Sequence, residues 1–156
     1  MRITLDTAIL VRANHLATGP ARALLLEILA QKHPLVISAS ILKEVERVLY
    51  YPRLIRLFGL SESDIIQFVT FLAALAEIAK IDETVATPIR DPNDVHVLRT
   101  AIGGMADYLC TLDGHFHEMP VVKLCSNLGI TVISDLNLLR LIRQPSNKNS
   151  GDRLIS

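Results

Sequence analysis

The chain has 156 residues, of which 50% are apolar and 21% are charged, and its formal net charge is zero. A domain of this length buries roughly two-thirds of its unfolded surface, and the composition excludes a disordered protein. Zero net charge argues against a strongly basic coat for nucleic acid, although a local basic strip remains compatible with it. Tryptophan is absent and aromatic residues are few, so we expect an aliphatic core.

The two cysteines, Cys110 and Cys125, fall in apolar segments without metal-ligand spacing. We therefore expect two reduced, buried thiols in a cytoplasmic protein. Met1-Arg2 leads directly into a β-prone run, so no signal peptide is expected. No apolar run approaches the roughly 20 residues that span a bilayer, and no membrane association is expected.

Apolar patterning predicts short strands that alternate with helices. The first predicted helix follows Gly19-Pro20, and Ser40 is the expected cap of a second helix that includes Glu44. Residues 53–58 are expected to form a helical turn, and residues 61–64 begin a long helix. Later helices begin at Asp91, Pro120 and Asp135, the first of them stopping at Gly103-Gly104. In chain order, the expected strands are residues 3–5, 35–38, 79–81, 106–111 and 130–133.

Strands that alternate with helices imply parallel βαβ units with right-handed crossovers. We therefore expect an α/β fold, a three-layer α/β/α sandwich around a central, mostly parallel sheet of about five strands. No internal repeat or linker is apparent, so residues 1–143 are expected to form one domain. The polar residues 144–156 are expected to be a disordered tail.

Acidic residues stand at the ends of predicted strands or in the first turns of the helices. Asp6 and Asp113 follow strands, whereas Glu44 and Asp94 lie one turn into helices. Ligands bind at the carboxyl ends of strands in open α/β sheets, so these acids are candidates for one common site. Clustered carboxylates repel one another unless a cation neutralises them, and Mg²⁺ or Mn²⁺ is the natural occupant. Such a site supports phosphodiester cleavage.

Each acid also has a structural explanation. An acid in the first turn of a helix opposes the helix dipole, which accounts for Asp94, and Asp91 is most simply the N-cap. Glu44 fits a solvated helix face, and Asp113-Gly114 fits a turn. Taken singly, the acids favour these structural explanations, and their joint placement shifts the balance only moderately towards a site.

Motifs in a particular order give the chain a resemblance to a known family. They are Leu5-Asp6-Thr7, the segment SASILKEVERVL at residues 38–49, and the segment from Asp91 to Asp113 with its ADYLCTLD run. A final Gly-Ile-x-Val-Ile run covers residues 129–133. Together they resemble the PIN domain family of metal-dependent ribonucleases, and within it the bacterial toxin-like PIN proteins.

The resemblance implies a site and a chemistry. The family's acidic quartet falls on Asp6, Glu44, Asp94 and Asp113, as ligands of Mg²⁺ or Mn²⁺ and as the catalytic residues. It implies RNA hydrolysis that leaves a 5′-phosphate and a 3′-hydroxyl. Hydroxyl groups are expected to support the quartet, and Asp107, at the opposite end of its strand, is expected to be structural. The supporting residues are Thr7, Ser38 and Thr111.

Substrate contacts are expected from Arg12 and Asn14 in the loop after Asp6. Other arginines, Arg47 among them, either line an RNA path or form a solvated surface. His115-Phe116-His117 is not expected to be a metal pair, because alternate positions after a turn need not converge. Many relatives read Asp-Thr-Asn where this chain has Asp6-Thr7-Ala8, which removes an amide near the site.

Two functions are therefore weighed. The first is a divalent-metal-dependent endoribonuclease, the toxin of a toxin–antitoxin pair, with an antitoxin partner and a plausible homodimer. The alternative is a PIN-fold module that binds RNA or protein with weak or no cleavage, and Ala8 is its only sequence support. A DNA-directed flap nuclease is expected to need a larger clamp region and more positive charge.

Overall fold

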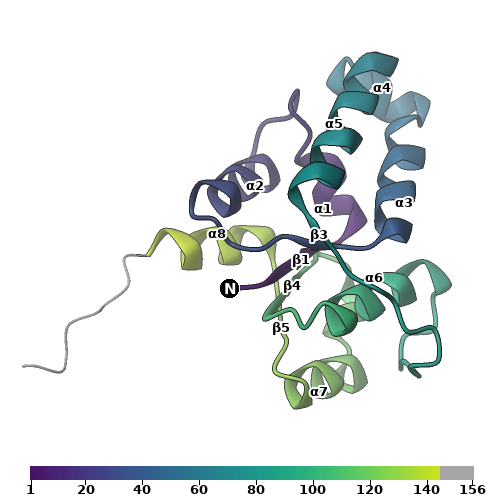
Figure 1. The fold of residues 1–156 in the computed structure, drawn as a ribbon, viewed down its shortest axis with the longest axis vertical. Coiled ribbons are helices and arrows are strands. Elements are labelled where there is room, and N and C mark those ends of the chain that lie inside the picture. The colour runs from purple at the N-terminus through teal and green to yellow at the C-terminus, as the bar shows by residue number, and fades with distance from the viewer. Residues whose placement is uncertain (145–156) are drawn as a thin grey trace, which may run out of the picture.

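The computed structural model describes residues 1–144, and Figure 1 shows their arrangement. The expected disordered tail therefore lies, except for Gln144, outside the described residues. Strands occupy the middle of the view, with helices above and below them. The architecture is the expected α/β fold with a parallel sheet flanked by helices.

The strands are short, parallel and in an order that requires crossovers. β1 (Ile3–Leu5), β4 (Tyr108–Cys110) and β5 (Thr131–Ile133) form a three-stranded sheet in the order β1-β4-β5. β2 (Val36–Ile37) and β3 (Glu77–Ile78) form a two-stranded sheet. A parallel bridge between Ile3 and Leu35 joins the two sheets. The expected sheet of about five strands is thus a three-stranded sheet with a two-stranded sheet attached by one bridge.

Helices cover both sides of these strands. In Figure 1, α6 and α7 lie below the strands, and α1, α2, α3, α5 and α8 lie above them. α8 packs on α2, while α3 packs on α1 and α5. The helices are α1 (Thr7–Arg12), α2 (Pro20–Ala30), α3 (Ala39–Leu49), α4 (Pro52–Phe58), α5 (Glu62–Leu75), α6 (Pro92–Gly103), α7 (Met119–Asn127) and α8 (Asp135–Arg143), with a 3₁₀ turn η1 (Gly114–His117) before α7.

The strand register aligns the carboxyl ends. Leu5 lies opposite Cys110, and Cys110 lies opposite Ile133. The backbone N–H of Asp6 donates to the carbonyl of Cys110 over 3.0 Å, and that of Thr111 donates to the carbonyl of Ile133 over 2.9 Å. The residues that follow these strands therefore emerge side by side at one edge of the sheet, where α1 and α8 also begin.

Several local expectations are corrected. The cap of α3 is Ser38, whose hydroxyl accepts from the N–H of Ile41, and not Ser40. The cap of α8 is Ser134, with Asp135 the first helical residue. The third strand is Glu77–Ile78 instead of residues 79–81. In each case the element is present and its boundary is displaced by one to three residues.

The core is aliphatic, as expected, and Phe116 is the largest fully buried side chain. Cys110 and Cys125 are buried free thiols. Among residues 1–144 no single helix is both long and apolar enough to cross a membrane. The pair α4 and α5 meets the criteria of length and composition only together, and its two helices are bent by 90°.

Candidate active site

Asp6 is fixed at the end of β1 by two hydrogen bonds. It is the N-cap of α1, and its Oδ1 accepts from the N–H of Ile9 over 2.9 Å. Its Oδ2 accepts from the hydroxyl of Thr111, which follows β4. The residue is only 6% exposed. A carboxylate is thus held nearly buried between the ends of the two central strands.

Thr111 joins Asp6 to Asp113. While its hydroxyl donates to Asp6, its Oγ1 accepts from the backbone N–H of Asp113 over 3.1 Å. The Asp113 carboxylate then caps the 3₁₀ turn η1 by accepting from the N–H of His115 over 2.9 Å. The expected supporting role of Thr111 therefore has a direct structural basis in contacts to two of the predicted acids.

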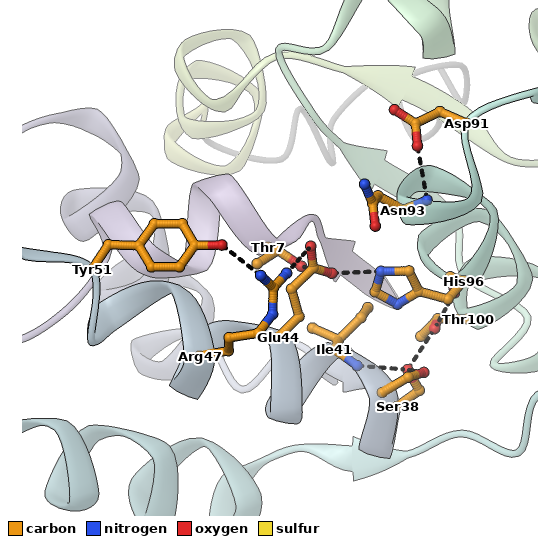
Figure 2. Close-up of polar contacts among 11 residues, drawn as sticks. Thr7, Ser38, Ile41, Glu44, Arg47, Tyr51, Asp91, Asn93, His96 and Thr100 are labelled. Carbon is orange, nitrogen blue, oxygen red and sulfur yellow. Dashed lines mark hydrogen bonds and ion pairs between the residues drawn. The ribbon is translucent and has the colours of Figure 1, made fainter. Parts of the chain in front are cut away.

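Glu44 projects from α3 towards α1 and α6, as Figure 2 shows. Its Oε2 accepts from the hydroxyl of Thr7 over 3.1 Å and lies 2.5 Å from Nε2 of His96. Its Oε1 lies 3.7 Å from a guanidinium nitrogen of Arg47. The side chain is 19% exposed. Glu44 therefore points towards the sheet edge, and the expectation of a solvated helix face is not met.

Asp94 and Asp113 meet at His115. Nδ1 of His115 lies 2.9 Å from Oδ2 of Asp94 and 3.4 Å from Oδ1 of Asp113. Asp91, the N-cap of α6, completes the group, because ligand atoms of Asp91, Asp94 and His115 all lie within 4.8 Å of one another. Within the described residues, this is the group whose spacing suits a metal ion. It opens on a pocket of about 310 Å³ lined in part by Asp91 and His115.

Contacts, together with short steps along the chain, link all four predicted acids. One path runs from Asp6 through Thr111 and Asp113 to His115 and Asp94. The other runs from Thr7, next to Asp6, through Glu44 to His96, which lies two residues beyond Asp94 in α6. The described contacts include no direct contact between two of the four carboxylates. The four carboxylates are instead bridged by hydroxyl groups and histidine rings at one edge of the sheet.

The electrostatics are those of crowded anions. Burial raises the pKa of Asp6, with a further increase from the charge of Asp113, while hydrogen bonds from Thr111 and Ile9 and the nearby Arg12 oppose the shift. Burial also raises the pKa of Asp94, and the neighbouring Asp113 and Asp91 add to it. The pKa of His115 is raised chiefly by its hydrogen bond to Asp94. The charged carboxylates therefore lack full compensation, which a cation would supply.

Two of the expected accessory residues have other roles. Asn14 was expected to contact substrate from a loop, but it follows α1 and is fully buried. Its amide donates to the carbonyl of Val11 and its carbonyl accepts from the N–H of Leu16, so the expectation of direct contact is corrected. Ser38 is 2% exposed and bonds to Thr100, and its described contacts reach none of the four acids.

Arg12 lies at the end of α1 and not in a loop. Its guanidinium is 4.0 Å from Asp135, and its charge partly opposes the rise that burial causes in the pKa of Asp6. Its Nε donates to the carbonyl of Ala8 over 3.3 Å, and because the side chain is 44% exposed, the guanidinium also faces solvent near Asp6. Ala8, which replaces the asparagine of many relatives, is exposed on the same helix. Asp107 accepts from the backbone N–H of Arg2 over 2.7 Å, a structural contact as expected.

Sequence reasoning missed three residues of this region. Asp135 is 6% exposed and follows β5, and after burial and Asp6 its charge adds to the rise in the pKa of Cys110, so it lies close to the same sheet edge. Its position after β5 was a usable signal, but it was interpreted only as a helix cap. Asp91 was also interpreted only as a cap. His115 was set aside with His117, and no local pattern shows that the ring of His115 turns towards Asp94.

The donor set suits a hard divalent ion. Carboxylate oxygens are the preferred ligands of Mg²⁺ and Mn²⁺, and burial, with a smaller contribution from neighbouring carboxylates, raises the pKa of both Asp6 and Asp94. The surrounding hydroxyls of Thr7 and Thr111 can orient carboxylate ligands. The residues therefore fit a divalent metal site.

Comparison with known protein families agrees with this architecture. A family model described as PIN domain matches residues 2–115, a span that includes Asp6, Glu44, Asp94 and Asp113. No curated protein and no solved structure matches the chain significantly.

Proposed function

The chain belongs to the PIN domain family, whose members are typically metal-dependent nucleases, and we propose that it is a divalent-metal-dependent endoribonuclease. The observation that carries the proposal is the connected set of contacts that brings Asp6, Glu44, Asp94 and Asp113 from four segments to one sheet edge. A fold alone does not define a reaction, whereas a cluster of carboxylates at a sheet edge points to metal-dependent chemistry.

The four carboxylates would hold Mg²⁺ or Mn²⁺, and the ion would supply an activated water and stabilise negative charge on the phosphate. The protein's own contribution is to position the ligands. Thr111 orients Asp6, and Thr7 orients Glu44, each through one hydroxyl hydrogen bond. Arg12, half-exposed beside Asp6, is placed to attract the phosphate backbone of RNA.

The direct test is cleavage of single-stranded and structured RNA by the purified chain with Mg²⁺ or Mn²⁺. Asp6→Asn and Asp113→Asn are each expected to reduce the rate more than about 100-fold, because even groups behind metal ligands contribute about 10–100-fold. Asp107→Asn is the matched control, since Asp107 lies at the other end of β4 and its amide analogue keeps an acceptor for Arg2. Equal rates in wild type and Asp6→Asn would reject the site.

We further propose that the nuclease acts as the toxin of a toxin–antitoxin pair in the cytoplasm. The resemblance to toxin-like PIN proteins supports this assignment. Induced expression in a bacterial host is expected to arrest growth, and co-expression of the neighbouring gene's product is expected to restore it. Asp6→Asn should be harmless in the same host. Unimpaired growth on expression of an active nuclease would contradict the toxin role and leave the enzyme assignment intact.

A homodimer is proposed through α4 and α5. Phe68 and Leu72 are buried in the core, but Leu57, near the end of α4, and Ile66, near the start of α5, are 65% and 53% exposed. Large apolar side chains exposed on neighbouring helices are typical of interaction surfaces. Light scattering after size-exclusion chromatography should give twice the monomer mass, and Leu57→Asp combined with Ile66→Asp should return it to the monomer value. A wild-type monomer at high micromolar concentration contradicts the dimer.

The alternative, a binding module without cleavage, shares the fold. The RNA cleavage assay distinguishes it, because tight RNA binding without metal-dependent hydrolysis would favour it. Ala8 is exposed on α1, and its side chain takes part in none of the described contacts that connect the four acids. The geometry of the acids therefore favours the enzyme.

A further inference from the structure

His115 occupies an unusual position for a half-exposed surface residue. Its Nδ1 contacts both Asp94 and Asp113, which belong to different elements, while its backbone N–H is fixed by the Asp113 carboxylate. Phe116, next in the chain, is 1% exposed and anchors the 3₁₀ turn in the core. The 3₁₀ turn is fixed by the Asp113 carboxylate before His115 and by buried Phe116 after it. It therefore holds the His115 ring next to the acids.

The spacing suits joint coordination of one ion. Two ligands bound at right angles, each about 2.1 Å from the metal, lie about 3 Å apart. Nδ1 of His115 and Oδ2 of Asp94 are 2.9 Å apart. Asp91 stands one helical turn before Asp94, and its ligand atom lies within 4.8 Å of those of both partners. A modest side-chain adjustment, chiefly of Asp91, would allow these three side chains to bind the same cation.

We propose that His115 is a nitrogen ligand of the divalent ion, with Asp94 and Asp91 as oxygen ligands, and that it gives this chain a preference for a transition-metal ion over Mg²⁺. The inference rests on the proposed metal-dependent function and refines the identity of the metal. It also assigns His115 and Asp91 to the site, in addition to the acidic quartet.

The chemistry of imidazole explains the preference. Mg²⁺ takes almost only oxygen ligands, whereas Mn²⁺, Fe²⁺, Co²⁺ and Zn²⁺ accept imidazole with rising affinity. An all-carboxylate site discriminates weakly among these ions, and one nitrogen ligand adds selectivity. The pocket beside Asp91 and His115 leaves the group open to solvent, so coordination positions remain for water and for a phosphate oxygen.

The experiment measures metal binding, not catalysis. Co²⁺ and Mg²⁺ are titrated separately into the metal-free full chain. Calorimetry monitors both titrations, and visible absorption also monitors the binding of Co²⁺. The variants are His115→Ala and His115→Gln, with His117→Ala as the matched control from the same 3₁₀ turn. Asp91→Asn tests the second new ligand, and asparagine preserves the helix cap. Because the His115 side chain is 53% exposed, its variants are expected to fold, and circular dichroism checks this.

Removal of the imidazole should weaken Co²⁺ binding by about 10-fold or more and change the Co²⁺ spectrum, while Mg²⁺ affinity changes by less than about 3-fold. His117→Ala should match wild type for both ions. Unchanged Co²⁺ affinity and spectrum in both His115 variants would overturn the inference and leave the nuclease proposal standing. If wild type binds neither ion, the metal-dependent function fails, and the inference fails with it.

Discussion

Nε2 of His96 lies 2.5 Å from Oε2 of Glu44, and this contact joins α6 to α3 across the site (Figure 2). Nδ1 of the same ring is buried and has no hydrogen-bond partner within residues 1–144, so Glu44 is the polar group that orients the ring. Because α6 also contains Asp94, the contact sets how two of the predicted ligands lie relative to each other.

His96 is therefore expected to position Glu44. His96→Phe keeps a planar ring but removes the contact with Glu44. Residues that hydrogen-bond to metal ligands contribute about 10–100-fold to metal affinity, and we expect about 10-fold weaker Mn²⁺ binding, the lower end of this range. His96→Gln, which can still donate to Glu44, should recover most of the affinity. Calorimetry with Mn²⁺ provides the measurement. If His96→Phe and wild type bind Mn²⁺ equally, the contact has only a structural role.

Thr111→Val tests the central hydroxyl. The change keeps the side-chain volume but removes the donor to Asp6 and the acceptor for the N–H of Asp113. We expect the free energy of unfolding to fall by about 1–3 kcal/mol, because buried polar groups lose their partner. Metal affinity should fall by about 10–100-fold.

Thr100→Val is the matched control for Thr111→Val. Thr100 is also fully buried, and its hydroxyl bonds to Ser38 and to the carbonyl of His96 instead of to an acid. It should lose comparable stability in denaturant titrations and keep metal affinity within about 3-fold. Equal losses of metal affinity in both variants would show that Thr111 acts only through stability.

The rule that ligands gather at the carboxyl ends of parallel strands selected Asp6 and Asp113 as candidates from the sequence. Asp6 and Asp113 follow β1 and β4, and the strand register places their neighbours side by side. The same rule applied to β5 would have selected Asp135. Asp135 was instead expected to be the cap of the last helix, although the cap is Ser134.

The contacts of His96 and His115 were not predictable from the sequence. A histidine gives the same local signal on a solvated surface and beside a carboxylate, and only the packing of α6 against α3 and η1 separates the two. The burial of Asn14 was missed for a related reason. The six-residue helix α1 is too short for a clear periodic pattern, so its end was interpreted as an exposed loop.

Gly103-Gly104 was correctly predicted to end α6, but the physical reason differs from the expected one. Gly104 has φ −86°, which any residue can adopt. A Cβ atom at Gly104 would lie 2.1 Å from Cγ1 of Val36, and one at Gly103 would lie 2.4 Å from the carbonyl oxygen of Lys80. These glycines allow α6 to pack closely against β2 and the segment after β3.

Gly104→Ala should therefore be destabilising despite the ordinary backbone conformation. Forcing a methyl group into this contact is expected to lower the free energy of unfolding by about 1–3 kcal/mol. Gly114→Ala is the control, because a Cβ there would meet no atom within 4 Å. Denaturant titration measures both. A stability loss in Gly104→Ala no greater than in Gly114→Ala would contradict the packing explanation.

Thr4→Val is expected to stabilise the fold. Thr4 is fully buried in β1, and its hydroxyl has no hydrogen-bond partner within residues 1–144. Valine has nearly the same shape and no polar atom to desolvate, so the free energy of unfolding should rise by about 1 kcal/mol. RNA cleavage should be unchanged. A destabilised Thr4→Val would show that the hydroxyl has a partner, such as an ordered water.

Asp64, which lies outside the active site, should make the free energy of unfolding depend on pH. It forms a capping box with Ser61 at the start of α5 and contacts His15 over 3.1 Å. Hydrogen bonds from the Ser61 backbone, from His15 and from the Ser61 hydroxyl lower its pKa from the ordinary 3.8 to about 2. A carboxylate with a lowered pKa stabilises the fold at pH values above its unfolded pKa, and this stabilisation is lost as the pH falls through the folded pKa.

Wild type should accordingly be more stable than Asp64→Asn by a constant margin between about pH 5 and pH 7, and the margin should shrink as the pH falls from about 4 to about 2. Thermal unfolding of both proteins across this range measures the margin, and their difference removes the contribution of the active-site acids. Glu62→Gln, a neighbouring change in the same first turn, is the control and should show a smaller margin. A margin for Asp64→Asn that stays constant down to pH 2 would contradict the assigned charge interaction.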